Sequence, residues 1–179
     1  MDARICAEVR GVAGAVDAGS VRKKYRALTL SLIEKKTTIT VMESCTGGQI
    51  SSLLTDTEGS SEVFKGSCVT YSNDAKVLDG VPAQIIGTYG VYSPQTALAL
   101  AQACRRKFGT DIGVGITGSF GNTDPANADS VPGEVYFAVE TAGGKQCLHC
   151  TVPPQEDRLS YKMYMADVVA DRLMKVLQG

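Results

Sequence analysis

Several features are missing from this sequence of 179 residues, and each absence argues against a class of protein. No apolar run is long enough to span a bilayer, so we expect no membrane partner. No basic block stands out and the formal net charge is −1, so nucleic acid is an unfavoured partner. Hydrophobic residues make up 44% of the chain and charged residues 21%, which is typical of one globular domain rather than a disordered or fibrous chain.

The first twenty residues lack the apolar core of a secretory signal, because Arg4, Glu8, Arg10 and Asp17 interrupt them. A transit peptide usually avoids such acids, so we expect a cytoplasmic protein. In that compartment the six cysteines are expected to be reduced thiols rather than disulfides. The sequence does not determine the oligomeric state and is compatible with a homo-oligomer.

The chain contains a single histidine, His149, and its position supports neither a serine–histidine hydrolase nor a metal site. It lies between Cys147 and Cys150 in CLHC, which resembles half of a zinc site. There is no second CxxC, and in a strand the two cysteines would face opposite sides. We therefore expect neither a metal nor an organic cofactor.

Hydrophobic periodicity, β-branched runs and capping residues predict the secondary structure. Residues 1–19 are expected to form an arm or a loose helix, and residues 20–179 a single domain. Helices are predicted over 20–36, 46–54, 74–78, 93–109 and 154–178, and strands over 37–42, 61–71, 111–117, 133–141 and 144–152.

Strands alternate with helices in the first part of the chain, and a hairpin through Ala142-Gly143-Gly144 joins the last two strands. This order predicts an α/β fold, a three-layer α/β/α sandwich with a mixed sheet. Ligands in such folds collect at the carboxyl ends of strands. The segments that follow predicted strands there are 43–48, 71–76 and 117–122.

The first of these segments is ESCTGG. With Thr46 as N-cap, Gly47 and Gly48 would open the helix and expose N–H groups that lack an intrahelical partner. Ser44 beside these donors would suit a nucleophile with an oxyanion hole, or a phosphate site. The pattern is explained equally well if Ser44 or Thr46 only caps the helix and the glycines only allow close packing of the backbone. Cys45 is an alternative nucleophile, although small buried thiols are more often structural.

The second segment, TYSNDAK, places Tyr71 at a strand end and Lys76 in the first turn of a short helix capped by Asn73. A lysine there would lie near the positive end of the helix dipole, which should lower its pKa. A neutral lysine can take a proton from a serine hydroxyl. The alternatives are a solvated surface lysine and a core tyrosine bonded to backbone.

The third segment, GITGSFG, ends a strand in a glycine-rich turn, where the Thr117 hydroxyl could contact a ligand or merely stabilise the turn. A long polar loop follows over 122–132, and such loops are often functional. Arg158, near the start of the last helix, could bind a phosphate or be solvated.

These motifs together resemble a known family. The stretches ESCTGG (43–48), DTEGSSEVFKGSCVTYSNDAKVLDGVP (56–82), YGVYS (89–93) and GITG (115–118) are similar to the C-terminal domain of the competence/damage-inducible CinA family. That domain, on its own, is nicotinamide-nucleotide amidase, also called nicotinamide mononucleotide deamidase. The resemblance covers roughly residues 20–178.

The resemblance implies an amidohydrolase acting on a small pyridine nucleotide. It implies that Ser44 is the nucleophile, Lys76 the general base and Tyr71 an assisting group. It implies further that substrate is bound around Thr46, Gly47, Gly48, Thr117, Gly118 and Arg158.

The sequence departs from the family pattern in two places. Tyr89 stands where the family usually has histidine, and GSFGNTDPANADSVPG (118–133) replaces a glycine-proline-glycine-rich stretch. Asp124 and Asp129 in this stretch would repel a phosphate. The alternative function is therefore a binding module of the same fold that holds a nucleotide or phosphometabolite without hydrolysing it.

Overall fold

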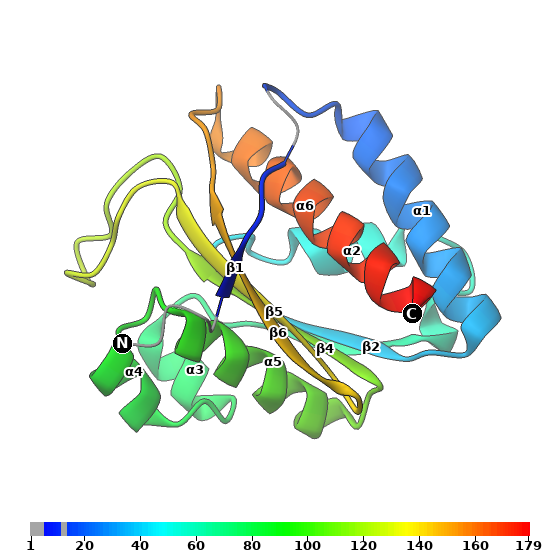
Figure 1. Ribbon diagram of the computed structural model, residues 1–179, viewed down its shortest axis with the longest axis horizontal. Helices are drawn as coiled ribbons and strands as arrows, with labels where there is room; N and C mark the ends of the chain where they lie inside the picture. The colour runs from blue at the N-terminus through cyan, green and yellow to red at the C-terminus, as the bar shows by residue number, and fades with distance from the viewer. Residues whose placement is uncertain (1–5, 12–13) are drawn as a thin grey trace.

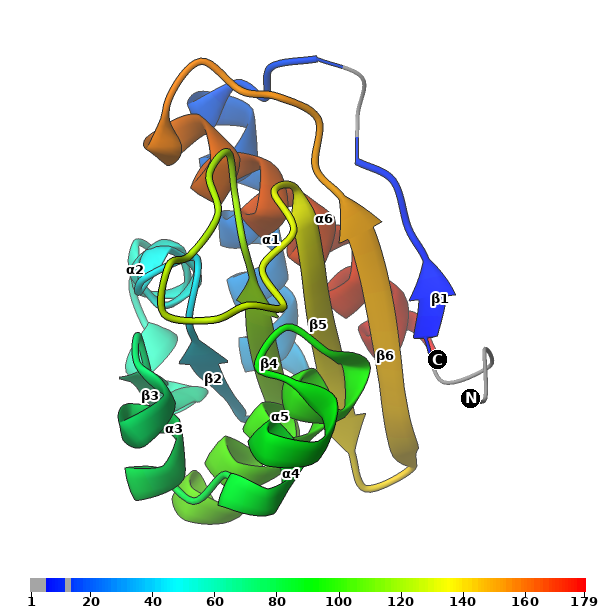
Figure 2. The ribbon, with the colours of Figure 1, turned by 90° about the vertical axis from the view of Figure 1, so that its left-hand side faces the viewer.

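The computed structural model describes residues 6–11 and 14–179. Helices α1, α2 and α6 cover one face of a sheet, and α3, α4 and α5 lie on the other (Figures 1 and 2). The strands are β1 (Cys6–Glu8), β2 (Ile39–Glu43), β3 (Phe64–Val69), β4 (Ile112–Gly118), β5 (Glu134–Thr141) and β6 (Gly144–Thr151). The helices are α1 (Ala18–Lys35), α2 (Gln49–Thr55), α3 (Asn73–Leu78), α4 (Ala83–Tyr89), α5 (Pro94–Phe108) and α6 (Arg158–Gln178), with a 3₁₀ turn η1 (Ser60–Glu62).

The strand order in the sheet is β1-β6-β5-β4-β2-β3. Strand β2 runs parallel to β3 and β4, whereas β4–β5 and β5–β6 are antiparallel pairs. The predicted α/β fold, with three layers and a mixed sheet, is confirmed. The predicted hairpin between β5 and β6 is also present.

The prediction of an arm or loose helix at the amino terminus is wrong for Cys6–Glu8, which form the parallel edge strand β1 beside β6. A strand of three residues is too short to show periodicity. The remaining part of that prediction falls partly on residues 1–5 and 12–13, which lie outside the described residues.

Capping residues set the helix ends. Asp17 accepts the Ser20 N–H at 2.7 Å, so α1 begins two residues before its predicted start. Ser93 caps α5 by accepting the Thr96 N–H at 3.2 Å, as predicted. Asp157 caps α6, which therefore begins at Arg158 rather than near residue 154. Helix α4 was not predicted.

The alternating sequence of β4 explains how the two helical layers contact the sheet. Val114 and Ile116 belong to the core shared with α1 and α6. Gly113 and Gly115 alternate with them and face α5, where a Cβ on Gly115 would lie 2.4 Å from backbone atoms of that helix and 2.6 Å from Leu100 Cβ. Two glycines therefore let α5 pack directly on the strand.

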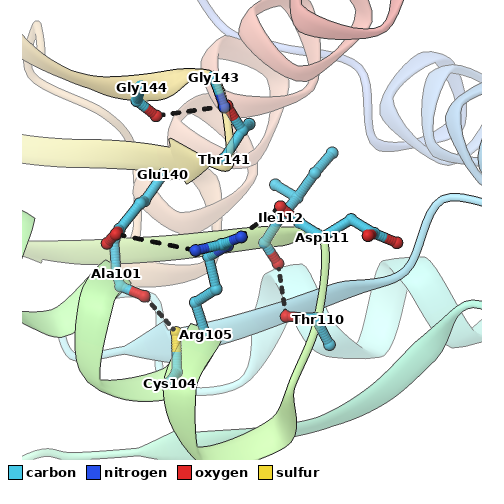
Figure 3. Close-up of polar contacts among 10 residues, drawn as sticks. All are labelled: Ala101, Cys104, Arg105, Thr110, Asp111, Ile112, Glu140, Thr141, Gly143 and Gly144. Carbon is cyan, nitrogen blue, oxygen red and sulfur yellow. Dashed lines mark hydrogen bonds and ion pairs between the residues drawn. The ribbon is translucent and has the colours of Figure 1, made fainter.

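The carboxyl end of α5 is fixed to the sheet by Arg105 (Figure 3). Its Nε donates to the Asp111 carbonyl at 3.1 Å, and its Nη1 lies 3.9 Å from Glu140 Oε1 on β5. One side chain thus connects α5 with the start of β4 and with β5. Tyr92, which lies just before α5, lines the cavity described below.

Gly115→Ala should lower the free energy of unfolding by roughly 1–3 kcal/mol, because the added methyl group overlaps the backbone of α5. Urea unfolding measures the loss. Gly87→Ala on α4 is the matched control, since no atom lies within 4 Å of its added Cβ and alanine favours the helix. Equal stability of the Gly115 variant and the wild type would contradict the packing described here.

Candidate active site

The three predicted segments meet at one edge of the sheet. They border a cavity of about 530 Å³ at the carboxyl ends of the parallel strands β2, β3 and β4. The residues that line it are Ser44, Cys45, Tyr71, Ser72, Asn73, Asp74, Tyr92, Gly118, Ser119, Phe120, Asn122, Asp124, Pro125, Ala126, Asn127 and Arg158. Five separate stretches of the chain therefore contribute to one site.

Ser44 and Lys76 are in contact at the bottom of this site. Lys76 Nζ lies 3.2 Å from Ser44 Oγ, although the residues are 32 positions apart in the chain. The Ser44 residue is 6% exposed and Lys76 is 1% exposed. A lysine buried to this extent is unusual unless its amine is bonded. The solvated surface lysine considered from the sequence is therefore excluded.

The other partners of the Lys76 amine orient it toward the serine. Nζ donates to the Thr70 carbonyl at 2.8 Å and to the Ser72 carbonyl at the longer distance of 3.5 Å. A neutral amine has two N–H donors and one lone pair. When the two carbonyls accept those donors, the lone pair points at the Ser44 hydroxyl, which is the arrangement that a general base needs.

Burial lowers the pKa of Lys76 to about 8, against the weaker opposing effects of Cys45 and Asp124. The cause that we inferred from the sequence is therefore wrong. Lys76 is the fourth of the six residues of α3 and lies in its last turn, and Ser72 rather than Asn73 caps that helix by accepting the Ala75 N–H. The pKa of Lys76 is therefore lowered by desolvation of its ammonium group and not by the helix dipole.

Cys45 follows the serine but is a poor nucleophile. Burial raises the pKa of its thiol to about 12, and Glu43 adds to the effect. Near neutral pH the side chain is therefore the protonated thiol, whereas the thiolate is the reactive form. This disfavours the alternative in which Cys45 attacks the substrate.

The turn after β2 differs from the predicted one. Gly47 and Gly48 have φ angles of +57° and +92°, so they form a left-handed turn, and the helix begins at Gln49. Gly48 is the N-cap, and the buried Thr46 hydroxyl has no partner among the described residues. The predicted capping by Thr46 is wrong because a carboxylate takes that role.

That carboxylate is Glu43, the last residue of β2, which is fully buried. It accepts N–H groups from Gly48 at 3.1 Å, Ile50 at 3.1 Å and Ser51 at 2.8 Å, together with the Ser51 hydroxyl. Sequence reasoning missed it. Its signal was an acid at the end of a buried strand and one short turn before a helix that begins at Gln49, since helix starts stabilise anions.

The contacts of Glu43 also determine which backbone N–H groups of the turn after Ser44 remain available as donors. The Gly48 N–H binds its carboxylate, and the Gly47 N–H binds the Ser44 carbonyl at 3.0 Å. Within the described chain, neither Cys45 nor Thr46 donates its N–H to another residue, and the Cys45 N–H interacts only with the thiol of the same residue. The donors available beside the serine are therefore these two, rather than the two glycines.

Tyr71 and Arg158 meet at the mouth of the cavity. Tyr71 is 60% exposed, which excludes a core role, and its hydroxyl accepts a hydrogen bond from Arg158 Nη2 at 2.9 Å. Arg158 also donates to Asn122 Oδ1 at 3.3 Å and lies over the Phe120 ring, 5.6 Å from its centre. Both predicted residues therefore reach the site.

Of the remaining predicted site residues, only Gly118 lines the cavity. Thr117 is fully buried and its hydroxyl donates to the Val91 carbonyl at 2.9 Å. Thr46, Gly47 and Gly48 do not line the cavity either. Gly47 and Gly48 instead shape the turn that follows the serine.

The polar connection 119–133 between β4 and β5, which projects at the left of Figure 1, forms one wall. Asp124 accepts hydrogen bonds from the Tyr92 hydroxyl at 2.7 Å, Asn127 Nδ2 at 2.6 Å and the Ala126 N–H at 2.9 Å. Asp129 accepts the Tyr92 N–H at 3.0 Å. Sequence reasoning missed Tyr92, which organises both acids of this wall.

The fold and the site define a three-layer α/β protein with a buried serine–lysine pair at the carboxyl edge of its sheet. The family model of the CinA C-terminal domain matches residues 22–177. The chain therefore belongs to the CinA C-terminal domain family.

Relatives and solved structures agree with this assignment. A CinA-like protein of Gemmatimonas aurantiaca is 36% identical over 139 residues, covering 77% of this chain and 32% of that protein. A CinA-like protein of Dictyoglomus thermophilum is 37% identical, covering 78% and 34%. The crystal structure of the competence/damage inducible protein CihA from Agrobacterium tumefaciens superposes with a TM-score of 0.81 at 26% identity, covering 93% of this chain and all of that one. The chain spans about a third of the length of the curated relatives it matches.

Two further properties concern the described residues only. None of their helices is long and apolar enough to cross a bilayer. They contain no group of three or more histidine, cysteine, aspartate or glutamate side chains arranged to hold a metal ion. His149 instead contacts Glu8 and Glu134, and Cys147 and Cys150 pack on opposite faces of the sheet.

The burial of Lys76 should make the stability of the protein depend on pH. Its folded pKa of about 8 lies below the unfolded value near 10.4, so the folded state binds fewer protons between these pH values. The contribution of Lys76 to the free energy of unfolding therefore becomes more favourable as the pH rises between these two pKa values. Below the folded pKa, burial of the charged amine destabilises the protein. The free energy of unfolding of Lys76→Met relative to wild type should fall by about 3 kcal/mol from pH 7 to 10.5.

Urea unfolding at several pH values measures this difference. Lys65→Met, which replaces an exposed lysine on β3, is the control and should follow the wild-type pH dependence. If the Lys76 variant and the wild type show parallel pH profiles, the amine is not desolvated as described.

Proposed function

We propose that this domain hydrolyses the carboxamide of nicotinamide mononucleotide to nicotinate mononucleotide and ammonia through an acyl-enzyme. Neutral Lys76 accepts the proton of Ser44, whose oxygen attacks the carboxamide carbon. The single observation that supports this most strongly is the 3.2 Å contact between a buried amine of lowered pKa and a serine hydroxyl at the edge of a cavity.

The developing oxyanion would be stabilised by the N–H groups of Cys45 and Thr46, which directly follow the nucleophile and are not donated to another described residue. Removal of one such donor has cost about 3–4 kcal/mol of transition-state stabilisation in another hydrolase. The protonated Lys76 then returns its proton to the departing ammonia. Water hydrolyses the acyl-enzyme, and no metal or organic cofactor takes part.

Tyr71 and Arg158 would act at the mouth of the cavity. Their mutual hydrogen bond fixes the guanidinium beside the opening, where it can bind the phosphate of the substrate. Gly118 would allow close approach of the ligand to the backbone. The hydroxyl of Thr117 is already donated to Val91, so this residue would position the chain rather than touch substrate.

A binding module is the second candidate, and the observation that favours it is the polar wall that replaces the glycine-rich stretch of the family. In this case the cavity would hold a nucleotide or phosphometabolite without turnover. Thermal-shift measurements with pyridine nucleotides, run beside an ammonia assay, separate the two candidates, because only the module binds ligand without releasing ammonia.

Ser44→Ala should abolish ammonia release from nicotinamide mononucleotide while the protein still folds, since only one small oxygen is removed. An enzyme-coupled ammonia assay and circular dichroism measure the two properties. Ser52→Ala, which removes an exposed hydroxyl from α2, is the matched control and should retain activity. Unchanged turnover in the Ser44 variant would refute the mechanism.

The pH dependence of kcat/KM should follow the Lys76 pKa. Lysine accepts a proton only when neutral, so kcat/KM should rise with pH and level off above about 8. Lys76→Arg should be nearly inactive over this whole range, because a guanidinium stays protonated. A rate that is independent of pH between 6 and 9 would point to a different base.

A further inference from the structure

Two of the six cysteines lie directly opposite each other on neighbouring strands. Cys6 of β1 and Cys147 of β6 are Cα partners in the parallel pair at one edge of the sheet (Figure 2). Neighbouring strands lie about 4.8 Å apart, which is within the Cα separation that a disulfide spans. Both residues are free thiols in the structure, and the Cys6 thiol donates a hydrogen bond to Cys147 Sγ at 2.9 Å.

The two thiols differ in their access to solvent. Cys6 is the one cysteine of the six that is not buried. Cys147 is 5% exposed and packs with Ala97 and Ala101 of α5, on the face of the sheet where Cys6 also packs. A reagent in solution therefore reaches the sulfur of Cys6, whereas Cys147 is placed to react with its neighbour.

The two thiols also differ in acidity. A hydrogen bond from the Cys147 thiol, helped by the charge of His149 and opposed by burial, lowers the pKa of Cys6. The same contact, together with burial, raises the pKa of Cys147. Burial raises the pKa of Cys104 to about 12 and that of Cys150 to about 11. Exposure and acidity thus both single out Cys6 as the thiol that reacts first, because the thiolate is the nucleophilic form.

We propose that Cys6 and Cys147 form a reversible disulfide, in which Cys6 reacts with a low-molecular-weight disulfide and Cys147 resolves the adduct. The Cys6 thiolate attacks one sulfur of the oxidant, so that a mixed disulfide forms and one thiolate leaves. Cys147 then loses its proton to solvent and attacks the Cys6 sulfur, which releases the second thiolate. The two protein thiols have lost two electrons and two protons, and the oxidant has become two thiols.

This disulfide would act on the edge strand β1. The strand has three residues, and beyond them the Val9 N–H donates to the His149 carbonyl at 2.9 Å. Detachment of so short a strand from β6 breaks few contacts. A bond between residues 141 positions apart in the chain prevents this detachment. The pair therefore couples the docking of β1 to the ratio of thiols to disulfides in the surroundings.

The test incubates the whole chain with glutathione disulfide, blocks the remaining thiols by alkylation and maps the peptides without reduction. We expect a peptide that contains Cys6 linked to Cys147, and we expect excess glutathione to restore both thiols, because an attacking thiol reaches the exposed sulfur of Cys6. Hydrogen exchange of the Val9 amide should slow by more than about tenfold in the oxidised protein, because β1 can no longer detach.

Two variants separate the roles of the thiols. Cys147→Ser keeps a hydroxyl donor beside Cys6 but lacks the resolving sulfur, so it should accumulate one glutathione adduct on Cys6. Cys6→Ser should form neither the adduct nor a disulfide under the same conditions. Cys150→Ala is the matched control, because this cysteine lies on the same strand but packs on the other face of the sheet. It should form the bond between Cys6 and Cys147 as readily as the wild type.

Several results would overturn the inference. One is the absence of the linked peptide after oxidation, and another is a Cys6→Ser variant that glutathione disulfide modifies as readily as the wild type. A disulfide that excess glutathione does not reduce would show that the bond is not reversible. Unchanged exchange of the Val9 amide after oxidation would show that the bond does not control the docking of β1.

Discussion

The buried contact between Lys76 Nζ and Ser44 Oγ is the interaction on which the rest of the site depends. An amine of this kind loses its hydration on folding, and the cost is visible in its lowered pKa. The carbonyls of Thr70 and Ser72 hold it in place, and both belong to the segment that joins β3 to α3. The same desolvation that is unfavourable for stability gives the lysine the character of a base near neutral pH.

The parallel pairing of β2 with β3 and β4 explains how such a contact forms. Parallel strands end at the same edge, so the segments after Glu43, Val69 and Gly118 are brought together although they are distant in the chain. Glu43 then stabilises the turn after β2 by accepting three backbone N–H groups. A buried carboxylate with this many donors stabilises the turn that follows Ser44, and it leaves the N–H groups of Cys45 and Thr46 without an acceptor on another described residue.

The charges around the cavity follow from elements that the sequence keeps far apart. Tyr92 lies just before α5, yet it binds both Asp124 and Asp129 in the connection between β4 and β5. Helix α6 brings Arg158 over the opposite side. The glycine-rich stretch expected for the family is therefore replaced by a polar wall with its own hydrogen-bond network. Its carboxylate faces a cavity that also contains a guanidinium.

The sequence by itself determined the order of the main helices and strands, the mixed sheet and the family, and it identified Ser44 and Lys76 as candidate site residues. Periodicity, capping residues and local motifs are properties of neighbouring residues, so they can be read from the sequence. It did not determine the strand Cys6–Glu8, whose three residues carry no periodicity, nor the left-handed turn at Gly47 and Gly48. Only the tertiary structure decided that burial rather than a helix dipole lowers the Lys76 pKa, and that the Thr117 hydroxyl turns away from the cavity. Desolvation and long-range hydrogen bonds depend on which segments pack together, and local sequence does not encode this directly.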